Sequence, residues 1–216
     1  MGDLGARRLY LCTADRPDLT GFLSACLRGG VDVVQLRDKD LPDRQIIRRA
    51  REAVEVCADF GVPFILNDRP DLALACGADG VHVGQDDTPP EVARKIMGPD
   101  AIIGFSTHAR TEWDEAGSEP VDYLSAGPVH ATPTKPGRPG TGVSYLAYVA
   151  STRLGASIPW FVTGGVTPET VPAMAAAGAR RFVVVRYLTE SGDPERAARS
   201  LCDAIQLSSA GGLSTQ

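Results

Sequence analysis

The sequence predicts a single (β/α)₈ barrel, an α/β fold also called a TIM barrel, and three observations support this prediction. The chain has 216 residues, which fits one barrel domain and is short for two ordinary domains. Short apolar runs rich in β-forming residues alternate with segments of helical periodicity from one end to the other. Eight such strand–helix units can be counted, and this count favours a closed barrel over a doubly wound open sheet.

Each expected strand is a short run of apolar residues. In chain order the runs are residues 8–13, 32–37, 63–67, 80–84, 101–106, 121–126, 158–163 and 181–185. The segment 43–60 carries apolar residues at helical spacing, and Pro90 and Pro168, each followed by a glutamate, mark the first turns of two further helices. One long irregular stretch, 127–142, is rich in Pro, Gly and Thr, and loops of that length are usually functional lids.

The composition limits the classes of partner. The net charge is -5 and the isoelectric point is near 5.2, which argues against nucleic acid or an anionic membrane as the main partner. The five cysteines are scattered and form no CxxC pair, so we expect reduced thiols in a cytoplasmic protein. We assign residues 1–206 to one barrel domain and expect the small, polar segment 207–216 to be a disordered tail.

Polar side chains occur near the carboxyl end of the second expected strand. Gln35 and Arg37 share a parity with Val33, so we expect them to point into the barrel mouth while the alternate side chains face the helices. Lys39 follows just beyond the strand. Arg37 and Lys39 could form a solvated rim, but the carboxyl ends of the strands are the catalytic face of such barrels. We therefore interpret these residues as part of a binding site.

Carboxylate, amide and hydroxyl groups follow the next three expected strands. Asn67 and Asp68 end the third strand, Asp87 follows the fourth, and Ser106 ends the fifth. Taken singly, Asn67 and Asp68 suit a helix cap, and Asp87 suits a turn. Two carboxylates at neighbouring strand ends, with an amide and a hydroxyl nearby, suit a Mg²⁺ ion that binds substrate phosphates. The agreement between consecutive strands favours the metal site.

Two further segments offer groups that bind phosphate. The segment 132–138 contains hydroxyls and cations, although it lacks the Gly-Lys-Ser/Thr element of a Walker A loop. Gly164 and Gly165 follow the seventh expected strand, and the eighth ends at Val185 and Arg186. Backbone amides after strands seven and eight form the recurrent phosphate site of these barrels, and glycine allows close approach. This position favours a phosphate site over an ordinary tight turn.

Together these motifs resemble the thiamin phosphate synthase family. The resemblance covers the chain from Leu9 to Ile205, and several independent motifs occur in the family's order and spacing. The matching segments are QLRDK at 35–39, ND at 67–68, HVGQDD at 82–87, GFSTH at 104–108, GP at 127–128, TPTK at 132–135 and GG at 164–165.

The resemblance implies a Mg²⁺-dependent transferase that joins 4-amino-2-methyl-5-(diphosphooxymethyl)pyrimidine to 4-methyl-5-(2-phosphooxyethyl)thiazole, or its carboxylate form, to give thiamin phosphate and diphosphate. No protein nucleophile is implied, because diphosphate leaves first and the thiazole nitrogen captures the pyrimidine cation. The implied metal ligands are Asp68 and Asp87, and the implied catalytic residues are Arg37, Lys39, Ser106 and Lys135. The implied substrate-binding residues are Gln35, Arg37, Lys39, Asn67, Ser106, Thr132, Thr134, Lys135, Gly165, Val185 and Arg186.

Within this resemblance, Ala131, Thr163 and Tyr187 depart from the family pattern, and Tyr187 falls beside the implied thiazole-phosphate pocket. A thiazole tautomerase would need only the thiazole-phosphate half of the site, so the charged residues of the diphosphate half favour the synthase. A non-catalytic sensor of thiamin precursors would bind without turnover. A phosphosugar epimerase is disfavoured because no acid–base pair of carboxylates is evident. We expect His82, inside a strand, to be structural, and the resemblance allows a homodimer.

Overall fold

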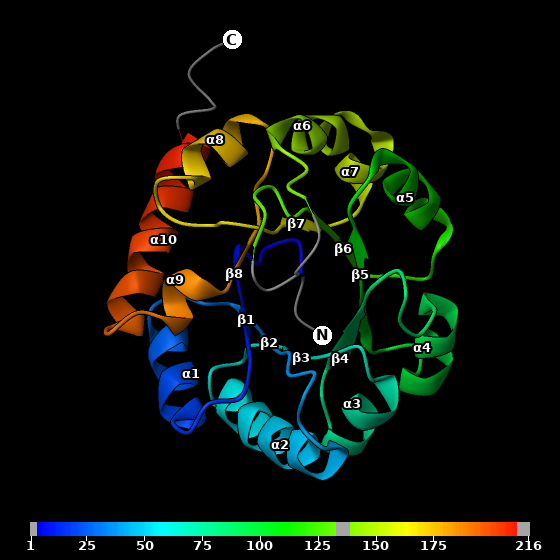
Figure 1. Ribbon diagram of the computed structural model, residues 1–216, viewed down its shortest axis with the longest axis vertical. Coiled ribbons are helices and arrows are strands. Elements are labelled where there is room, and N and C mark those ends of the chain that lie inside the picture. Colours follow the sequence, from blue (N-terminus) through cyan, green and yellow to red (C-terminus); the bar gives the residue numbers. More distant parts are fainter. Residues whose placement is uncertain (1–3, 133–138, 211–216) are drawn as a thin grey trace.

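The computed structural model describes residues 4–132 and 139–210, and these residues form a closed parallel barrel of eight strands (Figure 1). The strands are β1 (Leu9–Thr13), β2 (Val33–Leu36), β3 (Phe64–Asn67), β4 (Gly80–Val83), β5 (Ile102–Thr107), β6 (Tyr123–Ala126), β7 (Trp160–Val162) and β8 (Phe182–Val184). They pair in chain order, and β1 closes the barrel against β8, with Leu9 opposite Phe182. The predicted (β/α)₈ barrel is confirmed, and the open sheet is excluded.

Helices form a ring around the outside of the barrel (Figure 1). In the described residues they are α1 (Leu19–Arg28), α2 (Asp43–Asp59), α3 (Pro70–Cys76), α4 (Pro90–Met97), α5 (Arg110–Glu115), α6 (Val143–Ser151), α7 (Arg153–Ser157), α8 (Val171–Ala176), α9 (Arg186–Thr189) and α10 (Pro194–Ala210), with a short 3₁₀ helix η1 (Ala116–Ser118). Among these residues no helix is long and apolar enough to cross a lipid bilayer.

Two details of the predicted elements need correction. The helix α10 continues to Ala210, so residues 207–210 are helical and do not belong to a disordered tail, while 211–216 lie outside the described residues. The helix α8 begins at Val171 rather than at Pro168. A turn precedes it, in which the amide of Thr167 donates a hydrogen bond to Thr170 Oγ1 at 2.9 Å, and this turn delays the start of the helix.

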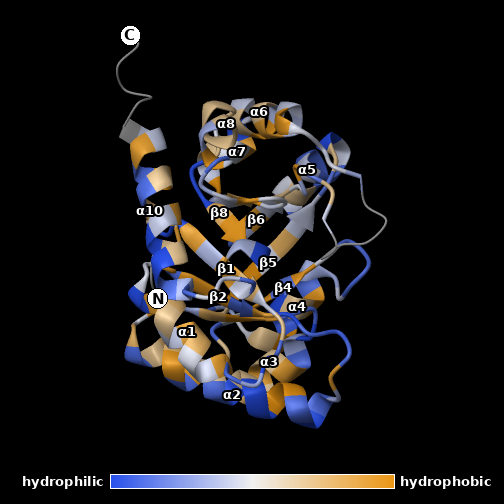
Figure 2. Ribbon diagram, turned by 60° about the vertical axis from the view of Figure 1, so that its left-hand side comes forward, coloured by the Kyte–Doolittle hydropathy of each residue, from blue (hydrophilic) through white to orange (hydrophobic). Residues whose placement is uncertain are grey.

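Alternate side chains of the strands divide the apolar core into two layers. The outward-facing residues of β1 and β2, such as Leu11 and Val34, pack with the helices in one large cluster. The inward-facing layer is smaller and consists of Leu4, Tyr10, Val33, Ile65, Ile102, Tyr123 and Phe161. Figure 2 shows hydrophilic residues on the outer sides of helices such as α2, away from the strands. The predicted parity of β2, with Val33 inside and Val34 outside, is confirmed.

The N-terminal segment closes the amino end of the barrel. Leu4 is buried in the inner cluster, and the carbonyl of Gly5 accepts a hydrogen bond from Arg181 Nη2 at 2.8 Å, just before β8 begins. With the amino end filled, the carboxyl ends of the strands are left for a binding site.

Candidate active site

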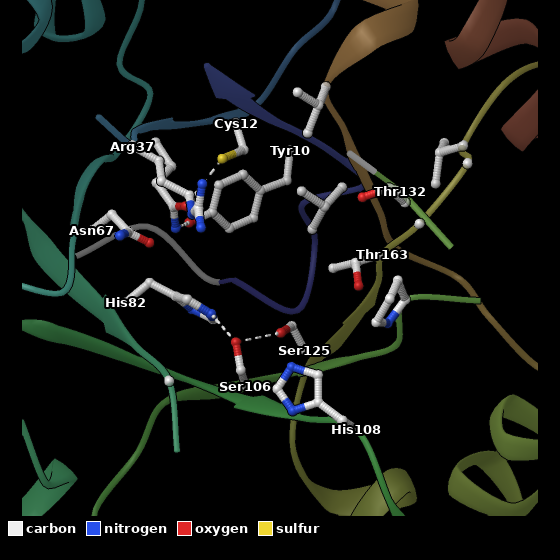
Figure 3. A pocket seen from close by; sticks show the side chains of 18 of the residues that line it. Tyr10, Cys12, Arg37, Asn67, His82, Ser106, His108, Ser125, Thr132 and Thr163 are labelled. Carbon is white, nitrogen blue, oxygen red and sulfur yellow. Dashed lines mark hydrogen bonds between the residues drawn. The ribbon is translucent and has the colours of Figure 1, made fainter. Parts of the chain in front are cut away.

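A cavity of about 430 Å³ opens at the carboxyl ends of the strands. It is lined by every predicted site residue that the structure describes. These are Gln35, Arg37, Lys39, Asn67, Asp68, Asp87, Ser106, Thr132, Gly165, Val185 and Arg186. Thr134 and Lys135 lie outside the described residues. Residues that are far apart in the sequence therefore face a single space, as Figure 3 shows for Arg37 and Asn67 on one side and Thr132 and Thr163 on the other.

The strand β2 and the turn after it contribute three of these residues. Gln35 is buried, and its amide donates to the Tyr10 hydroxyl at 2.8 Å. Arg37 follows the strand, half-buried, with its backbone amide bonded to the carbonyl of Thr13 at 2.8 Å. The carboxylate of Asp38 then accepts from the amide of Asp40 at 3.1 Å, and this turn presents Lys39 at the rim.

Asp68 leaves β3 in an unusual backbone conformation. Its φ is 63°, the one positive value of a non-glycine residue in the described part of the chain. Aspartate tolerates this left-handed region better than most residues. The amide of Asp68 donates to the carbonyl of His82 at 2.8 Å, and Lys39 Nζ lies 2.9 Å from Asp68 Oδ2. The conformation therefore brings the carboxylate to the lysine at the cavity rim.

Asp87 is both a turn residue and a neighbour of Asp68. Its Oδ2 accepts from the amide of Gly84 at 2.9 Å, so Asp87 does hold a turn, as one of the two interpretations of this residue predicted. Burial raises the pKa of the Asp68 carboxyl, Lys39 lowers it, and the nearby Asp87 carboxyl raises it again. A divalent cation would relieve the repulsion between these two carboxylates at the cavity rim.

The donor set fits Mg²⁺. Mg²⁺ prefers hard oxygen ligands and usually keeps waters or substrate phosphates in the remaining positions. Within the described residues no third acidic, histidine or cysteine side chain joins the pair to make a larger ligand cluster. Asp68 and Asp87 would thus hold the ion on one side and leave its other positions to a diphosphate.

The opposite wall is built from backbone. Gly164 and Gly165 have φ values of 95° and 75°, which favour glycine. A Cβ atom at Gly165 would lie 2.9 Å from His130 Cδ2, and one at Gly164 would lie 2.6 Å from the amide nitrogen of Val129. Thr170 Oγ1 holds the turn by donating to the carbonyl of Gly165 at 2.7 Å.

The amides on this wall are available to a ligand. Those of Gly165, Val185 and Arg186 donate to no acceptor among the described residues. A cluster of such amides suits an anion such as phosphate.

Comparison with known proteins identifies the family of this chain. A family model described as thiamine monophosphate synthase matches residues 9–188. The chain belongs to this family. The thiamine-phosphate synthase of Thermobifida fusca is 48% identical to it over 203 residues, covering 92% of this chain and 92% of the relative.

Two further comparisons support the assignment to the thiamine monophosphate synthase family. A thiamine-phosphate synthase of Thermus thermophilus is 47% identical, covering 92% of this chain and 97% of the relative. The solved structure of a thiamine phosphate pyrophosphorylase from Pyrococcus furiosus superimposes with a TM-score of 0.84 at 28% identity, covering 96% of this chain and 99% of that one. The predicted family, fold class and enzyme class, a transferase, are confirmed.

The departures from the thiamine monophosphate synthase pattern differ in position. Thr163, at the carboxyl end of β7, and Tyr187, in α9, both line the cavity. Ala131 is exposed. The expectation that Tyr187 lies beside the implied pocket therefore agrees with its position, whereas Ala131 is not among the residues that line the cavity.

Sequence reasoning missed several residues of the cavity floor. Tyr10, Cys12 and Ser125 line the cavity, and so does His82, which was expected to be only structural. The parity of β1 could have found two of them, because Tyr10 and Cys12 alternate with the outward-facing leucines of that strand. Figure 3 shows the hydrogen bonds that join His82 and Ser125 to Ser106 on this floor.

Proposed function

We propose that the chain joins 4-amino-2-methyl-5-(diphosphooxymethyl)pyrimidine to 4-methyl-5-(2-phosphooxyethyl)thiazole, or its carboxylate form, and releases thiamin phosphate and diphosphate. One observation carries the proposal: the residues assigned to the diphosphate and those assigned to the thiazole phosphate line the same cavity. A transferase of this kind requires both halves, because the thiazole nitrogen must lie close to the reacting pyrimidine carbon.

The first half of the site stabilises the leaving group. The bond between the pyrimidine methylene carbon and the diphosphate oxygen breaks, and its electron pair leaves with the diphosphate. Arg37 and Lys39, which line the cavity at the end of β2, offset the charge that develops there, and Ser106 donates a hydrogen bond to it. A Mg²⁺ ion held by Asp68 and Asp87 would supply further charge compensation when bound. We assign Lys135 to the same diphosphate.

The second half of the site holds the nucleophile. The amides of Gly165, Val185 and Arg186, with the hydroxyl of Thr132, bind the phosphate of the thiazole. We add the hydroxyl of Thr134 to this set. The amino group of the pyrimidine stabilises the cation left by diphosphate, and the lone pair of the thiazole nitrogen forms the new C–N bond. The protein's contribution is therefore position and charge rather than a nucleophile.

We also propose a location and partners for the enzyme. All five cysteines lie among the described residues and none forms a disulfide, which supports a reducing, cytoplasmic location. The partners we propose are small phosphorylated molecules, and a homodimer stays a prediction from the family resemblance.

An omission experiment tests the reaction class. Purified protein with Mg²⁺ is incubated with both substrates, with each substrate alone, and with the isomeric thiazole carboxylate phosphate alone. We expect thiamin phosphate and diphosphate in equal amounts, and only when both substrates are present. Isomerisation of the thiazole without any thiamin phosphate would instead establish a tautomerase, and tight binding without any product would establish a sensor.

A further inference from the structure

A chain of buried hydrogen bonds runs beneath the cavity from β2 toward β6. Cys12 Sγ donates to Gln35 Oε1 at 3.1 Å, and Gln35 Nε2 donates to the hydroxyl of Tyr10 at 2.8 Å. The hydroxyl of Tyr10 lies 2.9 Å from the hydroxyl of Tyr123. All of these atoms are buried, so their hydrogen bonds are shielded from bulk water.

The same chain continues to the other side of the floor. The hydroxyl of Tyr123 lies 2.9 Å from His82 Nδ1, and His82 Nε2 lies 2.9 Å from Ser106 Oγ. Ser125 Oγ donates to Ser106 Oγ at 3.4 Å (Figure 3). Gln35 and Ser106, on opposite sides of the barrel mouth, are therefore linked through side chains that sequence reasoning did not connect.

One direction of donation is consistent with every hydrogen bond in this chain. In this direction the Tyr10 hydroxyl accepts from Gln35 and gives its own hydrogen to the Tyr123 hydroxyl. Tyr123 then donates to His82 Nδ1, which makes Nδ1 an acceptor and leaves the imidazole proton on Nε2. His82 Nε2–H then donates to Ser106 Oγ, so Ser106, which lines the cavity, accepts in this hydrogen bond and does not use its own hydrogen for it.

We propose that Tyr123 is a positioning residue of the transferase reaction, acting through His82 to fix Ser106 as a hydrogen-bond donor toward the leaving diphosphate. This inference rests on the proposed function. Tyr123 is 1% exposed and lies beneath the cavity lining, so its influence on the substrates passes through His82 and not through contact. A donor oriented before the diphosphate arrives stabilises its charge without reorganisation.

A glycine on β5 supports this inference independently. A Cβ atom at Gly104 would lie 2.1 Å from Tyr123 Cζ and 2.4 Å from His82 Nδ1, so any larger residue would separate the two side chains at their point of contact. The rings of His82 and Tyr123 are stacked, with centroids 5.4 Å apart and planes inclined by 28°. The absence of a side chain at Gly104 of β5 therefore allows His82 and Tyr123 to be in contact.

Tyr123→Phe tests the link, because it keeps the ring and removes the hydroxyl. Tyr145→Phe is the matched control, since the Tyr145 hydroxyl is also buried but bonds to Thr107 Oγ1 at 2.8 Å, outside the chain. We expect kcat to fall about tenfold in Tyr123→Phe, with the KM for the thiazole phosphate unchanged, because only the donor to diphosphate is affected. Equal kcat values in the two variants would overturn the proposal.

A second measurement does not need turnover. Nitrogen-15 chemical shifts of the imidazoles in the unaltered protein report which ring nitrogen carries the proton, and loss of a signal in His82→Gln assigns it. We expect the Nε2–H tautomer at His82. The Nδ1–H tautomer would reverse the chain and overturn the inference even in an active enzyme, whereas absence of thiamin phosphate with the expected tautomer would count against the proposed function alone.

Discussion

Asp68 combines two features that are unfavourable in a folded protein. Its backbone adopts a φ of 63°, and its carboxyl has a pKa raised first by burial and then by Asp87, with only partial compensation from Lys39. A carboxyl whose pKa is higher in the folded than in the unfolded state stabilises the fold below its unfolded pKa, and this contribution is lost as the pH rises through the folded pKa. At neutral pH the ionised Asp68 therefore opposes folding.

Replacing this carboxylate separates stability from activity. We expect Asp68→Asn to raise the Tm of the metal-free protein at neutral pH by about 2–4 °C, because the amide removes the repulsion and asparagine tolerates positive φ. The same variant should form no thiamin phosphate. Circular dichroism melting in EDTA and a product assay measure both effects.

Asp71→Asn is the matched control for Asp68→Asn. Its hydrogen bond to Arg69 lowers the pKa of Asp71, so the substitution should leave the Tm unchanged or lower it slightly. Asp71 lies outside the cavity lining, and its variant should keep full activity. If the Tm of Asp68→Asn were below that of the unaltered protein, the ionised Asp68 would not oppose folding.

The raised pKa of Asp68 also predicts how metal use depends on pH. Because its carboxyl takes up a proton at a higher pH than an ordinary aspartate, the half-saturating Mg²⁺ concentration should rise as the pH falls from about 7 toward about 5. Initial rates measured against Mg²⁺ concentration at each pH give this value. A half-saturating concentration that stays constant over the range would show that Asp68 does not bind the metal.

At the scale of the elements, the turn after β7 depends on glycine. Gly165 has a φ of 75°, and its added Cβ would contact His130 in the wall proposed to hold the thiazole phosphate. We expect Gly165→Ala to raise the KM for the thiazole phosphate about tenfold or more, since the shifted turn misplaces its amides. Steady-state kinetics with each substrate varied in turn measure this effect.

Gly77→Ala is the control for that variant. Gly77 ends α3 with a φ of 77°, and a Cβ there would meet nothing within 4 Å. The left-handed conformation should cost each variant about 1 kcal/mol of unfolding free energy, and the contact with His130 should add to this loss in Gly165→Ala. Only Gly165→Ala should raise the KM for the thiazole phosphate. An equal KM in the two variants would show that this turn does not bind the phosphate.

The parity of single strands could be predicted, whereas contacts between strands could not. Gln35 was placed inside the barrel because alternate residues of β2 are apolar and face the helices. The partners of His82 come from β5 and β6, and spacing along the chain contains no information about that contact. Tyr10 and Cys12 were missed because a tyrosine and a cysteine in an apolar run look like core residues.

For the molecule as a whole, the inner cluster of the barrel has Leu4 at one end and meets the cavity at the other, where Tyr10 belongs to both. Leu4 fills the amino end of the barrel, on the far side of the inner cluster from the cavity. We expect Leu4→Ala to lower the free energy of unfolding by about 2 kcal/mol and to leave kcat unchanged. Urea unfolding and the product assay measure the two quantities.

Leu207→Ala provides the comparison for Leu4→Ala. Leu207 is 74% exposed, so its truncation should change the free energy of unfolding by less than about 0.5 kcal/mol. If Leu4→Ala were no more destabilising than this control, the N-terminal segment would have no part in closing the barrel.

The eight strand–helix units could be predicted from the whole sequence, but the C-terminal end of α10 could not. The serine-rich end of the chain has the composition of a tail, yet α10 continues through it to Ala210 and packs against α1 and α8. Ser208 and Ser209 donate to the carbonyls of Ala204 and Ile205, at 2.8 Å and 2.9 Å. Small polar residues can thus remain helical when the preceding turns are packed, which composition alone does not reveal.

We propose that Asp68 and Asp87 hold a Mg²⁺ ion against a substrate diphosphate at the mouth of this barrel. The most direct test follows thiamin phosphate formation from both substrates while Mg²⁺ is removed with EDTA and then restored, in the unaltered protein and in the Asp68→Asn, Asp87→Asn double variant. We expect product that disappears with EDTA and returns with Mg²⁺, and none from the double variant. An undiminished rate in EDTA, or from the double variant, would contradict the claim.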